Sequence, residues 1–314
     1  MLELAPLEGI TTYVYRNAYA HYYGDIDRYY TPFLSLHKEK EFNHKEREEI
    51  SPENNEGLHV IPQVLTNSAE DFLKAAHKLK ALGYAEVNIN MGCPSGTVTT
   101  KAKGAGMLAD TARLKDFLDA VFEQTPVNVS IKTRLGMESV EKWEPLLELY
   151  NNYPLAKLIV HARVRADFYQ NVPCWDAFGL AMEKSKNPLC YNGDIYTLED
   201  YQRLKETFPD LQDVMMGRGI LRNPFLPSQI RDKRYECMDT QDAHDVLRAF
   251  HDEIYAGYQA IQFGDRNILF KMKELWFYML NAIPEGEAFV KKMKKVNNCA
   301  DYEVLVRQIF ATRT

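Results

Sequence analysis

Short apolar runs alternate along this chain with longer segments that carry apolar residues at helical spacing. Eight runs are strand-like, at 2–5, 26–31, 58–64, 85–90, 127–133, 157–161, 188–192 and 212–216. Helix-like stretches separate most of them, at 69–82, 111–123, 140–152 and 197–207. Alternation of this kind is typical of a parallel α/β sheet. Eight units in about 230 residues favour a closed (β/α)8 TIM barrel over an open doubly wound sheet, so we predict this fold class.

The pattern changes after Pro224 and Pro227. Beyond about residue 240 there is no strand signal, and apolar residues such as Val246, Phe250 and Ile254 follow a helical period. Four helices are expected, at 241–262, 267–281, 285–296 and 301–311. We therefore predict a barrel domain at 1–235 and a small helical domain at 236–314. The irregular interval 32–57 is predicted to be an extended loop with a short helix.

Composition places the chain among globular proteins that act in a reducing compartment. Of its 314 residues, 46% are hydrophobic and 26% charged, and no apolar run approaches the roughly 20 residues that span a bilayer. The first strand-like run begins directly after Met1, so we expect no targeting peptide and a cytoplasmic location. The five cysteines are scattered without CxxC or Cys/His ligand spacing. This argues against disulfides, structural zinc and any other metal site.

The net charge of −6 weakly disfavours a nucleic-acid partner, because such proteins usually carry a basic field. A local basic run at 291–295, Lys-Lys-Met-Lys-Lys, leaves that partner open. The ordinary alternative for such a run is a solvated helix face.

Polar residues or glycines follow seven of the eight predicted strands. In a TIM barrel the loops at the carboxyl ends of the strands build the active site. The residues in question are Pro6, Leu7 and Glu8; Gln63; Asn90 and Cys93; Lys132 and Arg134; His161 and Arg163; Asn192, Gly193 and Asp194; and Gly217 and Arg218. Each has an ordinary alternative: Gln63 could satisfy backbone groups, Lys132 could cap a barrel layer, and His161 could be a core histidine. Their shared position favours one site.

Cys93 is a candidate for chemistry because it stands alone between Gly92 and Pro94, just past a strand. Glycines let the backbone approach a ligand closely, and a proline after the cysteine fixes the turn. Further glycines follow at Gly104 and Gly106. The alternative is a buried cysteine at a tight turn, since a free cysteine packs as a small hydrophobe.

The strand-end residues suggest that the barrel binds a flavin. The turns 192–194 and 217–219 occupy the place where barrels commonly hold a phosphate, with Arg218 and His161 adding positive charge. Lys132 could neutralise charge that develops near the flavin pyrimidine on reduction. Gln63 and Asn90 offer donors and acceptors for flavin carbonyls or for a substrate base. No GxGxxG motif opens a helix, so a tightly held dinucleotide is not indicated.

Taken together, these endings closely resemble the tRNA-dihydrouridine synthases. The segment 5–9 is similar to the family's flavin-contact turn, and 90–94 looks like its catalytic-cysteine motif. The segments 103–106, 132–136, 161–163, 192–194 and 217–219 match the remaining motifs in order and spacing. The resemblance covers about residues 2–225 strongly, and beyond that it rests on a helical tail.

The resemblance implies FMN-dependent reduction of the 5,6 double bond of uridine in tRNA, with NADPH as the transient reductant. Cys93 would be the catalytic acid, since a thiol is mostly protonated at neutral pH. The cofactor-binding residues would be Pro6, Leu7, Glu8, Gln63, Lys132, His161, Asn192, Gly193, Asp194, Gly217 and Arg218. Asn90, Arg134 and Arg163 would bind the substrate, and the lysine-rich tail would contact RNA phosphates. We expect a monomer.

Three alternatives remain open from the sequence. The same reaction on ribosomal RNA would share every motif. A flavin barrel that reduces a free pyrimidine would not need the helical tail. An RNA-binding factor without catalysis would not need Cys93, Lys132 and His161.

Overall fold

The computed structural model describes residues 1–37, 39, 41–232 and 241–311. Contacts divide the chain into two compact units. The first unit contains residues 1–6, 27–194 and 204–216, and the second contains residues 7–26, 195–203 and 217–314. The domain boundary predicted at 235–236 lies outside the described residues. Each unit is considered by itself.

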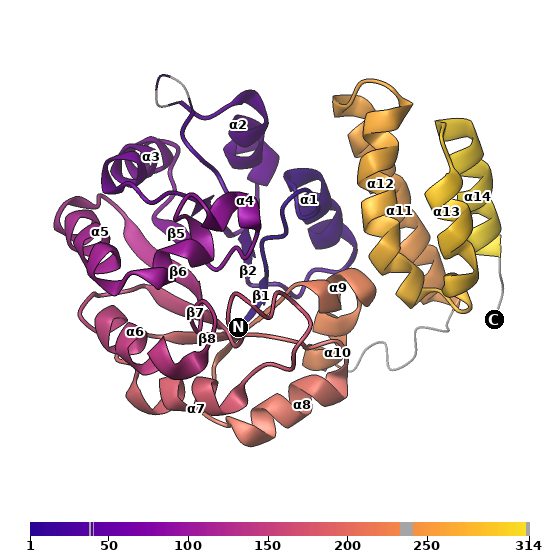
Figure 1. Cartoon of the computed structure of the whole chain (residues 1–314). Helices are drawn as coiled ribbons and strands as arrows, with labels where there is room; N and C mark the ends of the chain where they lie inside the picture. Colours follow the sequence, from indigo (N-terminus) through magenta and orange to yellow (C-terminus); the bar gives the residue numbers. More distant parts are fainter. Residues whose placement is uncertain (38, 40, 233–240, 312–314) are drawn as a thin grey trace. The chain divides into compact units, whose positions relative to one another are not determined.

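The first unit is built on a parallel sheet of nine strands in the described part of the chain, rolled into a nearly closed barrel (Figure 1). The strand order is β3-β2-β1-β9-β8-β7-β6-β5-β4. The strands are β1 (Leu2–Leu4), β2 (Arg28–Tyr30), β3 (Val60–Ile61), β4 (Gln63–Val64), β5 (Glu86–Met91), β6 (Asn128–Arg134), β7 (Lys157–His161), β8 (Leu189–Asn192) and β9 (Asp213–Met216). Only Pro62 separates β3 from β4. Because proline has no N–H to donate, it divides one predicted strand into two short ones.

Helices cover the outside of this barrel, with α3, α5, α6 and α7 arranged around the strands (Figure 1). The helices that lie wholly in this unit are α2 (His44–Ile50), α3 (Ala69–Ala81), α4 (Gly96–Thr99), α5 (Thr111–Gln124), α6 (Trp143–Tyr150) and α7 (Trp175–Lys184). Side-chain caps mark several of their starts. Ser68 accepts from Asp71 N at the start of α3, and Asp110 accepts from Ala112 N at the start of α5.

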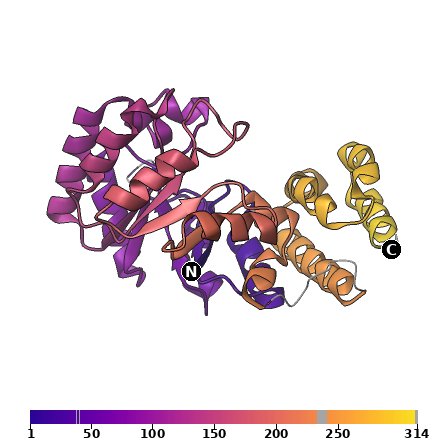
Figure 2. The same cartoon turned by 90° about the horizontal axis from the view of Figure 1, so that it is seen from below.

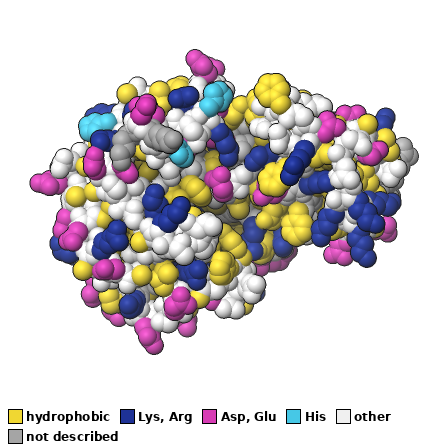
Figure 3. Space-filling view, turned by 45° about the horizontal axis from the view of Figure 1, so that its top comes forward, with side chains coloured by type: hydrophobic (Ala, Val, Ile, Leu, Met, Phe, Trp, Pro, Cys, Tyr) yellow, Lys and Arg dark blue, Asp and Glu magenta, His cyan; other side chains and the backbone are white. Residues whose placement is uncertain are grey.

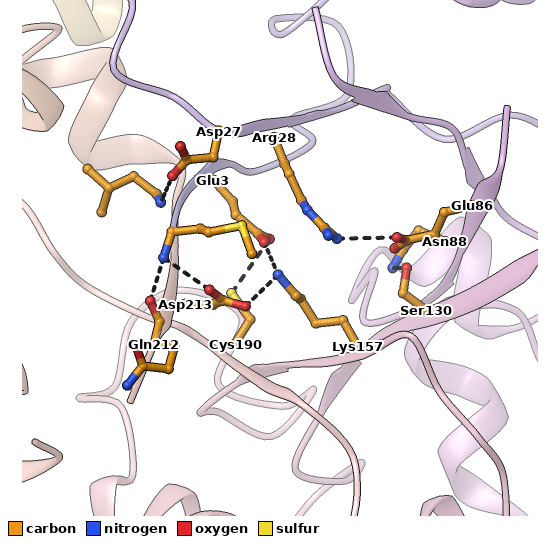
Figure 4. A network of polar contacts seen from close by, with 12 residues as sticks. Glu3, Asp27, Arg28, Glu86, Asn88, Ser130, Lys157, Cys190, Gln212 and Asp213 are labelled. Atoms are coloured by element: carbon orange, nitrogen blue, oxygen red, sulfur yellow. Dashed lines mark hydrogen bonds and ion pairs between the residues drawn. The ribbon is translucent and has the colours of Figure 1, made fainter. Parts of the chain in front are cut away.

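A buried ionic network fills the amino-terminal end of the barrel (Figure 4). Lys157, the first residue of β7, bridges the carboxylates of Glu3 and Asp213. The terminal amine of Met1 also reaches Asp213, at 3.0 Å, and the Cys190 thiol donates to Glu3 at 3.6 Å. Burial opposes the charge on Lys157, but the adjacent Glu3 outweighs it and raises the pKa of Lys157. This end of the barrel is therefore closed by paired charges.

The second unit packs the first helix of the chain against the C-terminal helices. Its helices are α1 (Tyr13–Tyr22), α9 (Arg218–Arg222), α10 (Leu226–Asp232), α11 (Gln241–Ile261), α12 (Asp265–Met279), α13 (Val290–Lys295) and α14 (Cys299–Ala311); α8 (Leu198–Thr207) starts here and ends in the first unit. Phe250 of α11 meets the ring of Tyr15 edge-on at 5.5 Å. Figures 1 and 2 show α11 to α14 side by side.

The predicted fold class is confirmed, and all eight predicted strand runs are present within two residues of their expected ends. The short helix expected within 32–57 is α2. Helices α1 and α7 were not among the predicted elements. None of the helices in the described ranges is long and apolar enough to cross a membrane.

Candidate active site

Strand register brings the predicted residues of the first unit to one end of the barrel. Gln63 pairs with Asn88, and Asn90 pairs with Lys132. Farther along the sheet, Arg134 pairs with His161, and His161 pairs with Asn192. Because all strands are parallel, these positions lie at the carboxyl ends. The predicted convergence of these distant residues is therefore present in the structure.

A chain of side-chain hydrogen bonds crosses three neighbouring strands below this rim. Asn88 Nδ2 donates to Ser130 Oγ at 2.9 Å, and Gln63 Nε2 donates to Asn88 Oδ1 at 2.8 Å. Asn90 Nδ2 donates to Gln63 Oε1 at 2.7 Å. All four residues are buried. The barrel thus holds a polar layer whose groups are paired with one another.

Cys93 lies on the loop after β5 and is half-buried. Asn90 Oδ1 accepts hydrogen bonds from the backbone N–H groups of Cys93 at 2.9 Å and Gly92 at 3.1 Å. Gly104 packs against the cysteine with φ +56°, and a Cβ there would lie 2.9 Å from the Cys93 carbonyl oxygen. Ala105 N also donates to that oxygen at 3.1 Å. The thiol therefore sits on a loop held from both sides, in contrast to Cys190, which is fully buried in the core.

Lys132 is half-buried near the end of β6. Among the described residues its ammonium has neither a hydrogen-bond nor an ion-pair partner. Burial, and secondarily the positive charge of Arg134, lower the pKa of Lys132 to about 7. Cys93 is close enough to influence this pKa as well. A negatively charged group placed beside Lys132 would therefore stabilise its ammonium form.

Arg134 is fully buried, and protein carbonyl groups surround its guanidinium. Nε donates to Gly92 O at 2.8 Å, Nη1 to Val164 O at 2.9 Å, and Nη2 to Phe168 O at 2.8 Å. The ring of Tyr169 lies 5.4 Å from Cζ. The side chain predicted to bind substrate thus also joins the cysteine loop to the loop after β7.

Arg163 and His161 form a second cluster, after β7. Arg163 makes a two-pronged ion pair with Asp194, and its Nη1 lies 3.3 Å from His161 Nε2. Since a guanidinium only donates, Nε2 is the acceptor in this contact. Asn192 anchors the neighbouring strand end by donating to Met215 O at 2.9 Å.

The remaining predicted residues are placed at turns. Pro6 ends the first-unit segment after β1, next to the Ala5 N to Met216 O hydrogen bond of 2.8 Å. Gly193 faces Tyr191, whose hydroxyl would lie 2.1 Å from a Cβ at that position. Leu7, Glu8, Gly217 and Arg218 belong to the second unit, so only their local surroundings are described.

In the second unit, the turn at 7–11 is tightly hydrogen-bonded. Thr11 Oγ1 accepts from Leu7 N at 2.8 Å, and Lys271 Nζ donates to Gly9 O at 2.8 Å. Arg218 follows Gly217 as the first residue of α9, and its guanidinium lies over the ring of Tyr196, 5.6 Å from the centroid.

Comparison with known proteins agrees with this geometry. The sequence model of the dihydrouridine synthase (Dus) family matches residues 3–310. The chain belongs to the dihydrouridine synthase family. It is 27% identical to the tRNA-dihydrouridine(16) synthase of Pseudomonas putida, over 95% of this chain and 94% of that protein. It is also 27% identical to the probable tRNA-dihydrouridine synthase 2 of Bacillus subtilis, over 80% of this chain and 78% of that protein.

Solved structures confirm the fold of this family member. Morphinone reductase superposes with a TM-score of 0.53 at 14% identity, covering 77% of this chain and 88% of that one. The old yellow enzyme homologue from Zymomonas mobilis gives a TM-score of 0.51 at 13% identity, covering 77% and 91%. At these identities the likeness concerns the barrel architecture alone.

Sequence reasoning did not assign Asn88 or Ser130 to the site. Asn88 had a usable signal: it lies two residues before Asn90 in a strand, so both side chains face the same side of the sheet. Ser130 carried no comparable signal, because its partner is set by packing. Within the described residues there is no group of three or more His, Cys, Asp or Glu side chains that could hold a metal ion.

Proposed function

We propose that this enzyme reduces the 5,6 double bond of specific uridines in tRNA to dihydrouridine. FMN is its cofactor and NADPH the transient reductant of the flavin. The enzyme works as a monomer in the cytoplasm. The observation that carries the proposal is the position of Cys93, held by Asn90 on a fixed loop beside Lys132, in a member of the dihydrouridine synthase family.

The donor set of the barrel fits a flavin. Lys132 supplies an unpartnered cation, as far as the described residues go, where a reduced flavin pyrimidine gathers negative charge. Gln63 would supply a hydrogen-bond donor for a carbonyl oxygen or ring nitrogen, and His161 is proposed to contact the cofactor beside it. The turn residues Pro6, Leu7, Glu8, Asn192, Gly193, Asp194, Gly217 and Arg218 would complete the proposed cofactor set, in which backbone N–H groups and Arg218 would bind the phosphate.

When bound, FMN supplies the hydride that adds to C6 of the base. The protein must then deliver a proton to C5, and Cys93 Sγ is the proposed donor. Asn90 holds the cysteine backbone and, with Arg134 and Arg163, is proposed to bind the substrate. A uridine in folded RNA must leave its stack to reach a barrel mouth, and aromatic side chains near the mouth, such as Tyr169, can contact it.

The C-terminal helices offer a surface that suits RNA. Four exposed lysines, Lys291, Lys292, Lys294 and Lys295, lie on α13. On α12, Arg266, Phe270, Lys273 and Phe277 recur at intervals of three or four residues and so share one face. Figure 3 shows Lys and Arg side chains gathered with hydrophobic ones over this part of the chain. Cations with interspersed aromatic rings bind phosphates and stack on bases.

Two measurements test the proposal. Purified protein should be yellow and take up FMN, and dihydrouridine should disappear from defined tRNA positions in cells that lack the gene. Loss of dihydrouridine from ribosomal RNA alone would favour the ribosomal alternative, and reduction of free uracil without RNA would favour the small-molecule alternative. Protein that cannot take up FMN would contradict the proposal altogether.

The RNA surface has its own test. Replacing all four lysines of α13 with Ala should weaken tRNA binding and flatten its dependence on salt, because fewer counterions are released. Replacing four exposed acidic residues far from α13 provides the control for a general charge effect. Unchanged affinity in the lysine variant would place the RNA contacts elsewhere.

A further inference from the structure

The direction of every hydrogen bond in the polar layer is fixed by the cysteine loop. The backbone N–H groups of Gly92 and Cys93 can only donate, so the Asn90 atom that faces them must be its carbonyl oxygen. The Asn90 amide nitrogen must therefore face Gln63, whose oxygen accepts from it.

The same reasoning fixes the directions of the next two hydrogen bonds in the polar layer. The Gln63 nitrogen then faces Asn88 Oδ1, and Asn88 Nδ2 faces Ser130 Oγ. Asn88 lies between Gln63 and Ser130 in this series of hydrogen bonds and is fully buried, as is Ser130. Its side chain makes no hydrogen bond to Asn90 but is linked to it through Gln63, so it acts on the site through Gln63.

This order determines which groups remain for a ligand. Each carboxamide nitrogen has a second N–H, and for Gln63 and Asn90 the described residues provide no second acceptor. The two side chains therefore present donors. Donors complement the carbonyl oxygens of a uracil-type edge, whereas cytosine carries an amino group at the equivalent C4 position. A flipped Gln63 would present an acceptor and reverse this preference.

We propose that Asn88 is a positioning residue for the reaction: through Gln63 it fixes the orientation of the Asn90 carboxamide and hence the loop of Cys93. The inference rests on the proposed function. A purely packing role for Asn88 is the competing explanation, and it predicts that an apolar residue of the same size would serve equally well.

Two substitutions at one position separate these roles. Asn88→Leu keeps the volume but removes the acceptor for Gln63. Asn88→Asp keeps that acceptor. Its second oxygen can accept from the Ser130 hydroxyl, which reverses the bond to Ser130 but leaves the orientation of Gln63 unchanged. Both variants are compared with wild type as FMN-loaded proteins, by the visible flavin spectrum, by kcat and KM with tRNA, and by the rate at which iodoacetamide alkylates Cys93 in flavin-free protein.

We expect Asn88→Leu to lower kcat on the order of tenfold, because small misplacements of reacting groups are costly, while KM stays within about twofold. Its flavin spectrum and Cys93 alkylation rate should shift, and Asn88→Asp should restore both. Unchanged kcat, spectrum and alkylation in Asn88→Leu would overturn the inference, as would an Asp variant as impaired as the Leu variant. If Asn88→Leu does not fold, the Asp variant paired with Ser130→Ala decides between the roles, since only a positioning role predicts a lower kcat at constant KM in Ser130→Ala.

Failure of the proposed function would look different. In that case the wild-type protein itself would form no dihydrouridine, whereas a failed inference leaves wild type active and the Leu variant equal to it.

Discussion

Arg134 Nε donates a hydrogen bond to the carbonyl oxygen of Gly92 at 2.8 Å, directly beside the cysteine of the candidate active site. The same guanidinium also donates to the carbonyl oxygens of Val164 and Phe168, in the loop after β7. One side chain therefore couples the position of Cys93 to the loop that carries Tyr169. A lysine cannot replace it, because a single ammonium lacks the planar fork that reaches three carbonyls.

Arg134→Lys should therefore lower both activity and stability. Leaving buried carbonyls without donors costs about 1–3 kcal/mol per group that water cannot reach, so the free energy of unfolding should fall by about 2 kcal/mol. Urea unfolding measures this change, and Arg165→Lys, at an arginine that is only partly buried, is the control. Equal stability of the Arg134 variant and wild type would show that the three hydrogen bonds are not important for the fold.

The lowered pKa of Lys132 predicts how FMN binding depends on pH. Below about pH 7 the side chain of the flavin-free protein is an ammonium, and above it the neutral amine predominates. The negative charge proposed to lie beside Lys132 belongs to the pyrimidine of reduced FMN, so reduced FMN binds better to the ammonium. Above pH 7 its binding must be accompanied by proton uptake, and its affinity should fall as pH rises. Anaerobic titration with reduced FMN across pH 6–9 tests this.

Lys132→Met serves as the reference in that titration, because it removes the group while leaving the phosphate ionisation of FMN unchanged. The variant should bind reduced FMN more weakly at pH 6 and show a flatter profile above pH 7. Parallel profiles for the two proteins would exclude Lys132 as the titrating group.

The ionic network at the amino-terminal end of the barrel should contribute to the free energy of unfolding without affecting the geometry of the candidate site. Lys157→Met leaves the fully buried Glu3 without its cation, and breaking a buried pair from one side costs about 3–5 kcal/mol. The double variant Lys157→Met/Glu3→Gln should recover part of the loss, since the uncompensated charge is gone. Lys115→Met, which removes an exposed pair with Asp119, should leave the denaturation midpoint unchanged. A single variant as stable as wild type would contradict the buried pairing.

His251 predicts a pH dependence of the second unit. Its Nε2 lies 2.6 Å from Tyr302 Oη, which accepts from Trp276 Nε1, and burial lowers the pKa of the imidazole although Asp252 opposes the shift. The unfolded chain, with an ordinary histidine pKa of about 6.5, therefore binds the proton more readily than the folded one. The contribution of His251 to the free energy of unfolding should therefore be constant above about pH 6.5 and decrease as pH falls below it.

Thermal unfolding from pH 8 to pH 5 measures this effect, and His251→Gln should have a shallower loss at low pH than wild type. Other histidines titrate in both proteins, so the informative quantity is the difference between the two curves. Identical slopes would mean that His251 is protonated equally in the folded and unfolded states.

The strands could be predicted because each is a short apolar run closed by a turn. Helix α1 was not predicted because its buried face includes Tyr15, Tyr19 and the charged Arg16, whose polar groups mask the apolar period. Helix α2 did carry a signal, the capping box formed by Asn43 and Glu46, within an interval otherwise dominated by charge.

The rim of the candidate site was predictable for a topological reason: parallel strands end at the same side of a barrel. The partners of the side chains were not. The three carbonyls around Arg134 come from loops whose course depends on packing, and the orientation of Gln63 depends on a backbone N–H at Cys93. The sequence identifies the residues of the site, and the fold determines which of them hold one another in place.

The most direct test of the account is the conversion of uridine in unmodified tRNA, followed by mass spectrometry of the nucleosides. Purified protein with FMN and NADPH should add two hydrogen atoms to a defined uridine. Cys93→Ala should retain FMN and its reduction by NADPH but lose dihydrouridine formation by about 100-fold or more, as expected for a missing general acid. Cys174→Ala, another half-buried thiol, should remain active. Dihydrouridine formed equally well by Cys93→Ala, or not at all by wild type, would contradict the account.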